Sequence, residues 1–332
     1  CREIAHGRFL PNYERLVLCA WPDLRLTSGR EPLKRPDTSV RIMRVFDCHS
    51  HWSTERGYIF QDPVERANQE KIWRTTAEFE TEQEMMETLR RNNVRSVLDL
   101  ALTIWMDDLD KIREVHDYTF KVARQNRDVV FGHWLSFNPE IGREGIKEFE
   151  RAVAADAGFI GFGIVGQTKG GFPASDPIWD PFYKLSIDAG IPVLIHCGLT
   201  GIGQGMPGGR GILLDDGHPR HIDMVAARFP ELRILAARPA YPWQDEMIAI
   251  LLHKGNVHYE LHGWSPKTLP PQLVREINGR LQDRIMFGCD YPVLKFEMMI
   301  DRWRGLGLSD EVLEKVLYKN AEAYFPNATI AA

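Results

Sequence analysis

The feature that most restricts the fold of this chain is an alternation of short apolar runs with longer amphipathic stretches. From residue 44 onward the pattern repeats every roughly 30 to 40 residues, which is typical of βα units around a parallel sheet. Eight runs have the length and apolar character of strands that are buried on both faces. We predict strands at 45–51, 96–102, 130–137, 159–165, 192–197, 233–237, 257–262 and 284–290.

Each predicted strand is followed by a stretch with helical periodicity. Asn92, Gly190 and Gly255 stand where helix C-terminal stops are expected. The predicted helices cover 81–92, 107–126, 143–155, 178–189, 219–229, 243–253, 271–281 and 310–324. Eight strands and eight helices are the count that closes a (β/α)8 TIM barrel. An open doubly wound sheet is the alternative fold.

The barrel domain is expected to span 44–332, preceded by an N-terminal arm at 1–43. The arm contains four prolines with scattered charges, so we expect it to lie over the barrel or over a neighbouring subunit. Two connections, 52–79 and the glycine-rich 198–217, are long and should lie over the C-terminal mouth of the barrel.

Composition narrows the classes of partner. A formal net charge of −5 and a pI near 6.2 give no electrostatic reason to expect nucleic acid or an anionic membrane surface. No apolar run approaches the roughly 20 residues that cross a bilayer, and the first residues lack the order of a secretory signal. Five cysteines without a CxxC pair favour a reducing cytosol. We therefore expect a cytoplasmic protein that acts on small molecules, as a homo-oligomer (a dimer or a tetramer).

The strongest local motif is Asp47-Cys48-His49-Ser50-His51 at the end of the first predicted strand. Side chains two apart on a strand point the same way, so both imidazoles should face the barrel axis. Neutral imidazole is a good ligand for zinc and other late divalent metals. By itself, a His-x-His pair is weak support for a metal site.

Two further strands end in a polar residue after an apolar run. His196 closes the fifth strand and Asp290 closes the eighth. A polar or charged group in such a place needs a partner or a metal. The C-terminal ends of barrel strands also form the face where active sites lie. These residues fit a metal site better than a set of core histidines with a salt-bridged aspartate.

Cys48, Cys197 and Cys289 each neighbour a proposed ligand, which raises the alternative of thiolate ligands or nucleophiles. Strand alternation argues against it. If His49, His196 and Asp290 point inward, the cysteines should point outward beneath the helices and pack as small hydrophobes.

Together these residues resemble the amidohydrolase superfamily, within it the amidohydrolase-2 branch that includes aminocarboxymuconate-semialdehyde decarboxylase and resorcylate-type decarboxylases. The resemblance rests on the motif at 47–51, on His196, on His-Pro-Arg-His-Ile-Asp at 218–223 and on Phe-Gly-Cys-Asp-Tyr-Pro at 287–292. It implies a metal-dependent (β/α)8 barrel. It also implies one divalent ion, usually zinc and sometimes manganese, bound by His49, His51, His196 and Asp290.

The chain departs from the family at the sixth strand. Where the family commonly has a histidine that orients or activates metal-bound water, this chain reads Leu235-Ala236-Ala237-Arg238-Pro239-Ala240. Arg238 cannot act as a base, because its guanidinium keeps its proton. Three interpretations compete: a structural salt bridge, a bidentate grip on a substrate carboxylate, which we prefer, and a loss of hydrolytic activity.

Other candidate site residues follow from position. Glu260 and His262 should share one face of the seventh strand and could replace the absent histidine as a proton shuttle. Asp290 is the stronger candidate for proton transfer. Trp264 and Arg210 are candidates for substrate binding. Trp52, Trp73 and Trp134 are further candidates for an aromatic pocket wall.

We predict a metal-dependent enzyme that decarboxylates a small hydroxyaromatic or cyclic carboxylic acid without oxidation. Asp290 would then protonate the ring carbon as carbon dioxide leaves. Two alternatives remain: hydrolysis of a lactone, amide or carbon–carbon bond by metal-activated water, and a metal-binding accessory subunit of a hetero-oligomer.

Overall fold

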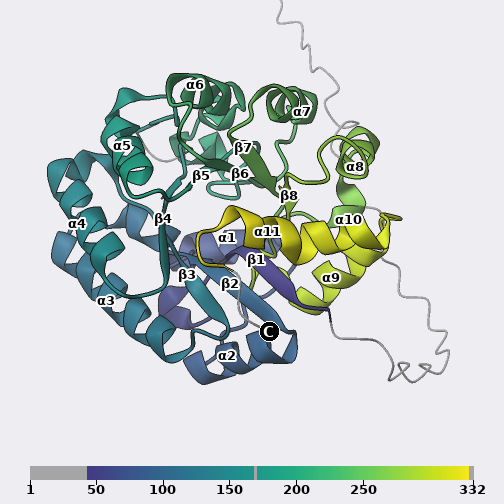
Figure 1. Cartoon of the computed structure of the whole chain (residues 1–332). Helices are drawn as coiled ribbons and strands as arrows, with labels where there is room; N and C mark the ends of the chain where they lie inside the picture. The colour runs from purple at the N-terminus through teal and green to yellow at the C-terminus, as the bar shows by residue number, and fades with distance from the viewer. Residues whose placement is uncertain (1–42, 168–169, 329–332) are drawn as a thin grey trace, which may run out of the picture. The chain divides into compact units, whose positions relative to one another are not determined.

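The computed structural model describes residues 43–167 and 170–328 (Figure 1). The predicted arm at 1–43 therefore lies almost entirely outside the described residues, and its role stays a prediction. The described residues from 43 onward group as one compact unit. The predicted division of the chain into an arm and a barrel domain stays a prediction.

Eight parallel strands form one sheet in sequence order, from β1 to β8. The strands are β1 Val45–Ser50, β2 Val94–Asp99, β3 Val130–Leu135, β4 Phe159–Ile164, β5 Val193–His196, β6 Ile234–Ala237, β7 Val257–Glu260 and β8 Ile285–Met286. Backbone hydrogen bonds then join the last strand segment to the first. Cys48 N donates to Phe287 O over 2.9 Å, and Asp290 N donates to His49 O over 2.9 Å. The predicted (β/α)8 barrel is confirmed and the open sheet is not formed.

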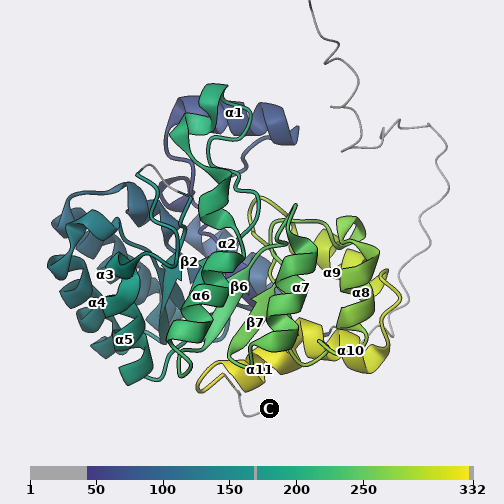
Figure 2. The same cartoon turned by 90° about the horizontal axis from the view of Figure 1, so that it is seen from above.

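The helices surround this barrel, as Figures 1 and 2 show. They are α1 Pro63–Trp73, α2 Glu82–Arg91, α3 Leu109–Gln125, α4 Arg143–Ala154, α5 Asp180–Asp188, α6 Arg220–Arg228, α7 Gln244–His253, α8 Pro271–Ile277, α9 Phe296–Arg304, α10 Asp310–Glu314 and α11 Asn320–Tyr324. All eight predicted helices are present. The last predicted helix, however, is divided into α10 and α11 by a π-helical turn at Lys315–Lys319.

Two helices, α1 and α9, are not predicted from the sequence. Helix α1 lies inside the connection that was treated as a long loop. Asp62 caps its first turn by accepting from Val64 N, and Pro63 occupies the first helical position. The described residues that α1 buries are the polar Glu65 and Gln69, so it carries no apolar stripe that could reveal it.

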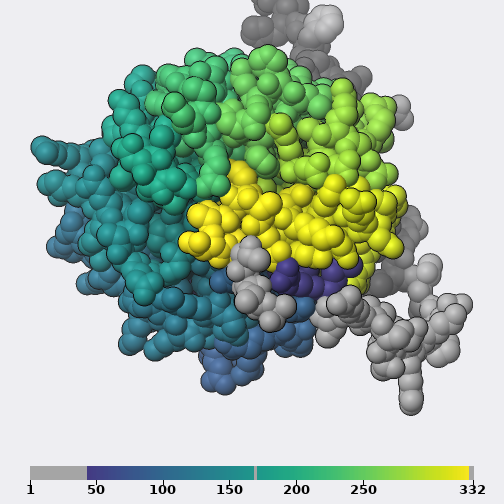
Figure 3. All heavy atoms as spheres, in the orientation of Figure 1, coloured from purple at the N-terminus to yellow at the C-terminus, as the bar shows by residue number. Residues whose placement is uncertain are grey.

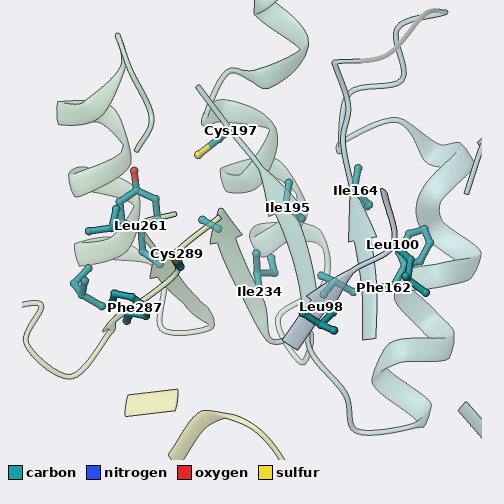
Figure 4. Packing of buried hydrophobic residues seen from close by; sticks show 14 of the residues in the cluster. Leu98, Leu100, Phe162, Ile164, Ile195, Cys197, Ile234, Leu261, Phe287 and Cys289 are labelled. Atoms are coloured by element: carbon teal, nitrogen blue, oxygen red, sulfur yellow. The ribbon is translucent and has the colours of Figure 1, made fainter. Parts of the chain in front are cut away.

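The apolar residues form two layers of core. The outer layer lies between strands and helices, and Figure 4 shows part of it, including Cys197 and Cys289. The inner layer fills the barrel and contains Phe46, Cys48 and Met286. Cys48 thus faces inward, with its Sγ 3.8 Å from Met286 Sδ, so its predicted outward orientation is wrong. All three thiols are buried, and burial raises the pKa of each, which fits their packing as hydrophobes.

The irregular path of β1 explains this difference. Asp47 pairs with Ser96 and Ser50 pairs with Leu98, so three residue steps on β1 stand against two on β2. Such a bulge interrupts strict alternation and re-aims the side chains beside it. Cys48 and His49 can therefore both face the barrel interior, although they are neighbours in the chain.

Different segments of the chain lie over the two ends of the barrel. One end is closed by the C-terminal segment, whose Tyr324 and Phe325 pack into the inner core. Figures 1 and 3 show this segment, in yellow, lying across that end. At the opposite end α1 lies with the glycine-rich segment after β5 (Figure 2). Trp73 Nε1 and Asn68 Nδ2 both donate to Gln204, over 2.9 and 2.8 Å.

In the part of the chain that the structure describes, no helix combines the length and the hydropathy needed to cross a membrane.

Candidate metal centre

The structure brings the four predicted ligands together at the mouth of the barrel. His49 and His51 lie at the end of β1, His196 ends β5, and Asp290 follows β8. The ring centroid of His49 lies 5.0 Å from that of His51 and 5.2 Å from that of His196. His51 Nε2 lies 3.2 Å from Asp290 Oδ1. Residues separated by up to 241 positions in the chain thus meet in one cluster.

Asp47 connects the backbone segments that carry this cluster. Its Oδ2 accepts from Ser96 Oγ over 2.5 Å, and its Oδ1 accepts from Cys289 N over 2.8 Å. The side chain therefore ties β1 to β2 and to the segment that carries Asp290. Burial raises the pKa of Asp47 to about 6, although these hydrogen bonds act in the opposite direction. Asp290 itself has a φ of 71°, a left-handed conformation that aspartate tolerates better than most residues.

Asp99 at the end of β2 belongs to the same cluster, and the sequence analysis missed it. Its Oδ2 lies 3.6 Å from His49 Nε2 and 3.6 Å from His196 Nε2. The signal was available, because Asp99 is a lone carboxylate in the apolar run Val97-Leu98-Asp99-Leu100. The same argument had singled out Asp290. The predicted strand, however, continued past Asp99 to residue 102, which hid its position at a strand end.

Several buried polar atoms of this cluster have no hydrogen-bond partner in the part of the chain that the structure describes. They include both ring nitrogens of His49, both carboxylate oxygens of Asp99 and Nε2 of His196. Unpaired buried groups of this kind are costly unless a ligand satisfies them. Burial, the largest cause in each case, lowers the pKa of His49 and brings that of His196 to about 4. Neutral imidazoles beside carboxylates are the donor set that a divalent cation requires, so these residues fit a metal ion.

His51 and Asp290 form the second half of the cluster. Burial alone would raise the pKa of Asp290, but the hydrogen bond to His51 and the nearby positive charges hold it well below its usual range. Burial would lower the pKa of His51, yet the same hydrogen bond and the charge of Asp290 raise it. Asp290 is therefore ionised at neutral pH, as a metal ligand or a proton acceptor must be.

Glu260 and His262 lie together beneath the cluster, as their spacing predicts. The strand ends at Glu260, and the chain then turns so that His262 folds back onto the same carboxylate. His262 Nδ1 lies 2.5 Å from Glu260 Oε1, and His262 N donates to Oε2 over 2.9 Å. Burial raises the pKa of Glu260 to about 8 and lowers that of His262 to about 3. The imidazole of His262 stacks on His49 with a centroid distance of 3.7 Å.

Arg238 follows β6 and reaches into the mouth with a φ of 62°. Its Nε and Nη2 lie 3.4 and 3.3 Å from His262 Nε2, and Nη1 donates to Leu199 O over 3.1 Å. Among the described residues it forms no ion pair with a carboxylate, which removes the structural salt bridge. A guanidinium carries five N–H donors, so some remain free to bind a ligand.

The cluster opens into a small cavity of about 40 Å³. His51, His196, Arg238 and Asp290 line its polar side. The two long connections contribute Phe60, Trp73 and Ile202 to its apolar walls. Of the four predicted tryptophans, Trp73 is thus the one that lines this cavity.

Two predicted substrate-binding residues lie elsewhere. Arg210 is paired with Glu65 of α1 at 2.5 Å and lies 5.4 Å from the ring centroid of Trp105. Trp264 packs against Tyr241, with ring centroids 5.6 Å apart. Neither residue lines the cavity beside Asp290. Their roles in substrate binding stay predictions.

Comparison with known proteins agrees with this geometry. The model of the amidohydrolase family matches residues 46–326, which is most of the chain. The chain belongs to the amidohydrolase family. The predicted resemblance is thereby confirmed, and as a family member the chain is a metal-dependent enzyme, a decarboxylase or a hydrolase. A search of curated proteins finds no match.

Solved structures with the same fold include three decarboxylases. The 5-carboxyvanillate decarboxylase of Sphingomonas paucimobilis is 18% identical, with a TM-score of 0.59 over 85% of this chain and 99% of that one. The 2,6-dihydroxybenzoate decarboxylase of Rhizobium is 16% identical, with a TM-score of 0.62 over 85% and 98%. A dihydroxybenzoic acid decarboxylase of Polaromonas, with bound manganese and the inhibitor 2-nitroresorcinol, is 15% identical, with a TM-score of 0.64 over 85% and 97%. At these identities the likeness shows the fold.

Proposed function

We propose that this enzyme removes carbon dioxide, without oxidation, from a small hydroxyaromatic carboxylic acid. The observation that carries the proposal is that Arg238 and Asp290 both line one small cavity beside the histidine cluster. A guanidinium suits a substrate carboxylate, and an ionised aspartate can take and return a proton. Three solved decarboxylases with this fold act on acids of the same class.

The site also lacks a group that the competing hydrolysis would use. Strand β6 contains Ile, Leu and two Ala residues, and Arg238 follows, so no histidine stands there to orient a water molecule. Both ring nitrogens of His262 are engaged, Nδ1 by Glu260 and Nε2 by Arg238. We therefore assign Glu260 and His262 to positioning Arg238 rather than to proton transfer.

A divalent ion, zinc or manganese, would be held by His49, His51, His196 and Asp290. When bound it supplies positive charge that attracts the phenol and carboxylate oxygens of the substrate. Zinc is the ion that the histidine-rich ligand set favours. Manganese is the ion bound in the decarboxylase of Polaromonas.

Two residues of the protein transfer the proton and bind the substrate carboxylate. Asp290 accepts the phenolic proton as the substrate binds and delivers it to the ring carbon that bears the carboxylate. The bond between that carbon and the carboxylate breaks, its electron pair stays with the ring, and carbon dioxide leaves. Arg238 holds the carboxylate until this step. Because carbon dioxide is uncharged, its contact with the guanidinium is then lost, which favours release.

The cavity must enlarge for such a substrate. An apolar cavity that binds benzene has a volume of about 150 Å³, whereas this cavity measures about 40 Å³. Its movable walls are Phe60 and Trp73 on one side and Ile202 on the other. We expect α1 and the glycine-rich segment to shift when substrate enters, as active-site lids do.

The experiment that tests the function uses the full chain loaded with zinc or manganese. A panel of hydroxybenzoic acids is incubated in deuterium oxide, and the products are examined by NMR and mass spectrometry. We expect release of carbon dioxide and one deuterium atom at the ring carbon that lost it. Failure to turn over any hydroxyaromatic acid, or hydrolysis of a lactone or amide panel instead, would overturn the proposal.

Arg238→Ala tests the carboxylate contact. Loss of a hydrogen bond to a charged group costs about 1.5–3 kcal/mol, so KM should rise by roughly 10- to 100-fold. The matched control is Arg228→Ala, which removes an arginine paired with Asp180 on the surface. An unchanged KM in Arg238→Ala would remove this residue from substrate binding.

A further inference from the structure

Asp99 is a buried carboxylate that has no hydrogen-bond partner among the residues that the structure describes. Its side chain is 1% exposed, and neither oxygen accepts a hydrogen bond from any described residue. The separations of 3.6 Å to His49 Nε2 and His196 Nε2 are too long for hydrogen bonds. Burying a carboxylate without a partner is energetically unfavourable. A group that is not among the described residues must therefore compensate it.

The histidines do not provide this compensation themselves. Nε2 of His49 and Nε2 of His196 each stand 3.6 Å from Asp99 Oδ2, and neither makes a hydrogen bond to it among the described residues. Arg238 directs its N–H groups to His262 and to the Leu199 carbonyl. A small cation is the partner that can satisfy two imidazole nitrogens and a carboxylate oxygen at once. The nitrogens of His49 and His196 and an oxygen of Asp99 all lie within 4.8 Å of one another.

We propose that Asp99 is a ligand of the same cation that His49 and His196 bind. This inference rests on the metal site of the proposed function, which it deepens by one ligand from β2.

The charges at the mouth support this assignment. Three neutral imidazoles with Asp290 alone would leave one positive charge on a buried divalent ion. With Asp99 the two carboxylates balance the two charges of the ion. The charge of Arg238 is then left for the carboxylate of the substrate.

The additional ligand also affects the choice of ion. Carboxylate oxygen suits manganese better than imidazole does, and a closed zinc site is normally satisfied by four protein ligands. Asp99 therefore makes the site more favourable for manganese than the three histidines and Asp290 would be. Removing its charge should weaken manganese binding more than zinc binding.

The test compares Asp99→Asn with the control Glu148→Gln. Both changes replace a buried carboxylate by an amide of nearly the same shape, but Glu148 lies between α3 and α4, away from the mouth. Metal-free protein is prepared by dialysis and titrated calorimetrically with Mn²⁺ alone and with Zn²⁺ alone. Melting temperatures are recorded with and without each ion.

We expect Asp99→Asn to lower manganese affinity by roughly a hundredfold or more, given that even outer-shell partners change affinity 10- to 100-fold. Its metal-free melting temperature should be equal to that of the wild type or higher, because an uncompensated charge is removed. Glu148→Gln should show the reverse, with lower stability and unchanged affinity. Asp99→Asn with wild-type affinity, or with lower metal-free stability and an unchanged cation-induced shift, would overturn the assignment.

A second variant keeps the test decisive if Asp99→Asn does not fold. Asp99→Cys loaded with Co²⁺ should show a thiolate-to-cobalt charge-transfer band in excess of the spectrum that the wild type gives under the same conditions. Absence of the band would count against Asp99 as a ligand. If the wild type itself bound neither ion, both the metal site and the proposed function would be wrong. If the wild type bound an ion but Asp99 proved not to be a ligand, only this inference would be wrong.

Discussion

Two buried carboxylates with histidine neighbours differ in how the protein treats them. Glu148 on α4 accepts hydrogen bonds from Arg151 on both oxygens and from Arg113, and His116 Nδ1 lies 2.7 Å from its Oε1. Asp99 on β2 is equally inaccessible and has no hydrogen-bond partner among the described residues. The hydrogen-bonding capacity of Glu148 is used within the protein, whereas Asp99 would gain its partner only from a ligand.

This difference separates a structural cluster from a binding cluster by a physical criterion. A buried charge that is fully hydrogen-bonded contributes to the packing of the helices that carry it. A buried charge without partners raises the free energy of the folded state, and ligand binding can offset this penalty. The burial of a carboxylate beside a histidine therefore does not distinguish the two roles, but the number of its partners does.

The largest expected effect concerns activity at the mouth. Asp290→Asn removes the group that we assign to proton transfer, so kcat for the hydroxyaromatic acid should fall by about 10²- to 10⁴-fold. Glu148→Gln should leave kcat per folded molecule unchanged. The measurement is steady-state turnover at saturating substrate, with folded protein quantified by circular dichroism. Equal losses in both variants would show that the two clusters do not differ in the way proposed.

An intermediate effect concerns stability with and without the ion. At a hundredfold excess over its Kd, a ligand that binds only the folded state contributes about 2.7 kcal/mol. For a domain of this size, whose unfolding entropy is about 2.1 cal/mol/K per residue, the melting temperature should rise by about 4–5 °C. His49 belongs to every candidate ligand group among the described residues, so His49→Ala should lose this rise. An undiminished rise in that variant would place the ion elsewhere.

The smallest expected effect is an acid dependence at the structural cluster. Burial would raise the pKa of Glu148, but the hydrogen bonds from His116 and Arg151 outweigh it and lower the pKa to about 2, against an ordinary value of 4.5. The stabilisation is therefore present above pH 4.5 and is lost as the pH falls toward 2. Chemical denaturation of metal-free protein across this range should show a shallower acid slope for Glu148→Gln. An unchanged slope would mean that Glu148 contributes no acid-sensitive stability.

Much of the fold was predictable from the sequence because its signals are local. Short apolar runs and helical periodicity repeat along the chain, and each run predicts its own strand without knowledge of the others. The polar residues at the ends of these runs, His196 and Asp290, then fall at one face of any barrel that forms. Helix α1 escaped because its buried positions are polar, so no periodic apolar signal marks it.

The sequence by itself therefore determined the eight-stranded barrel, its family, and the chain positions at which polar side chains meet the mouth. Only the tertiary structure decided which of these side chains have partners. It turned Cys48 inward through a bulge in β1, paired Arg210 with Glu65 and gave Asp99 no hydrogen bond from any described residue. The physical reason is that periodicity reports which face of an element is buried. A hydrogen bond or ion pair depends on atoms from distant segments of the chain that approach within a few ångströms. A local sequence pattern contains no information about such contacts.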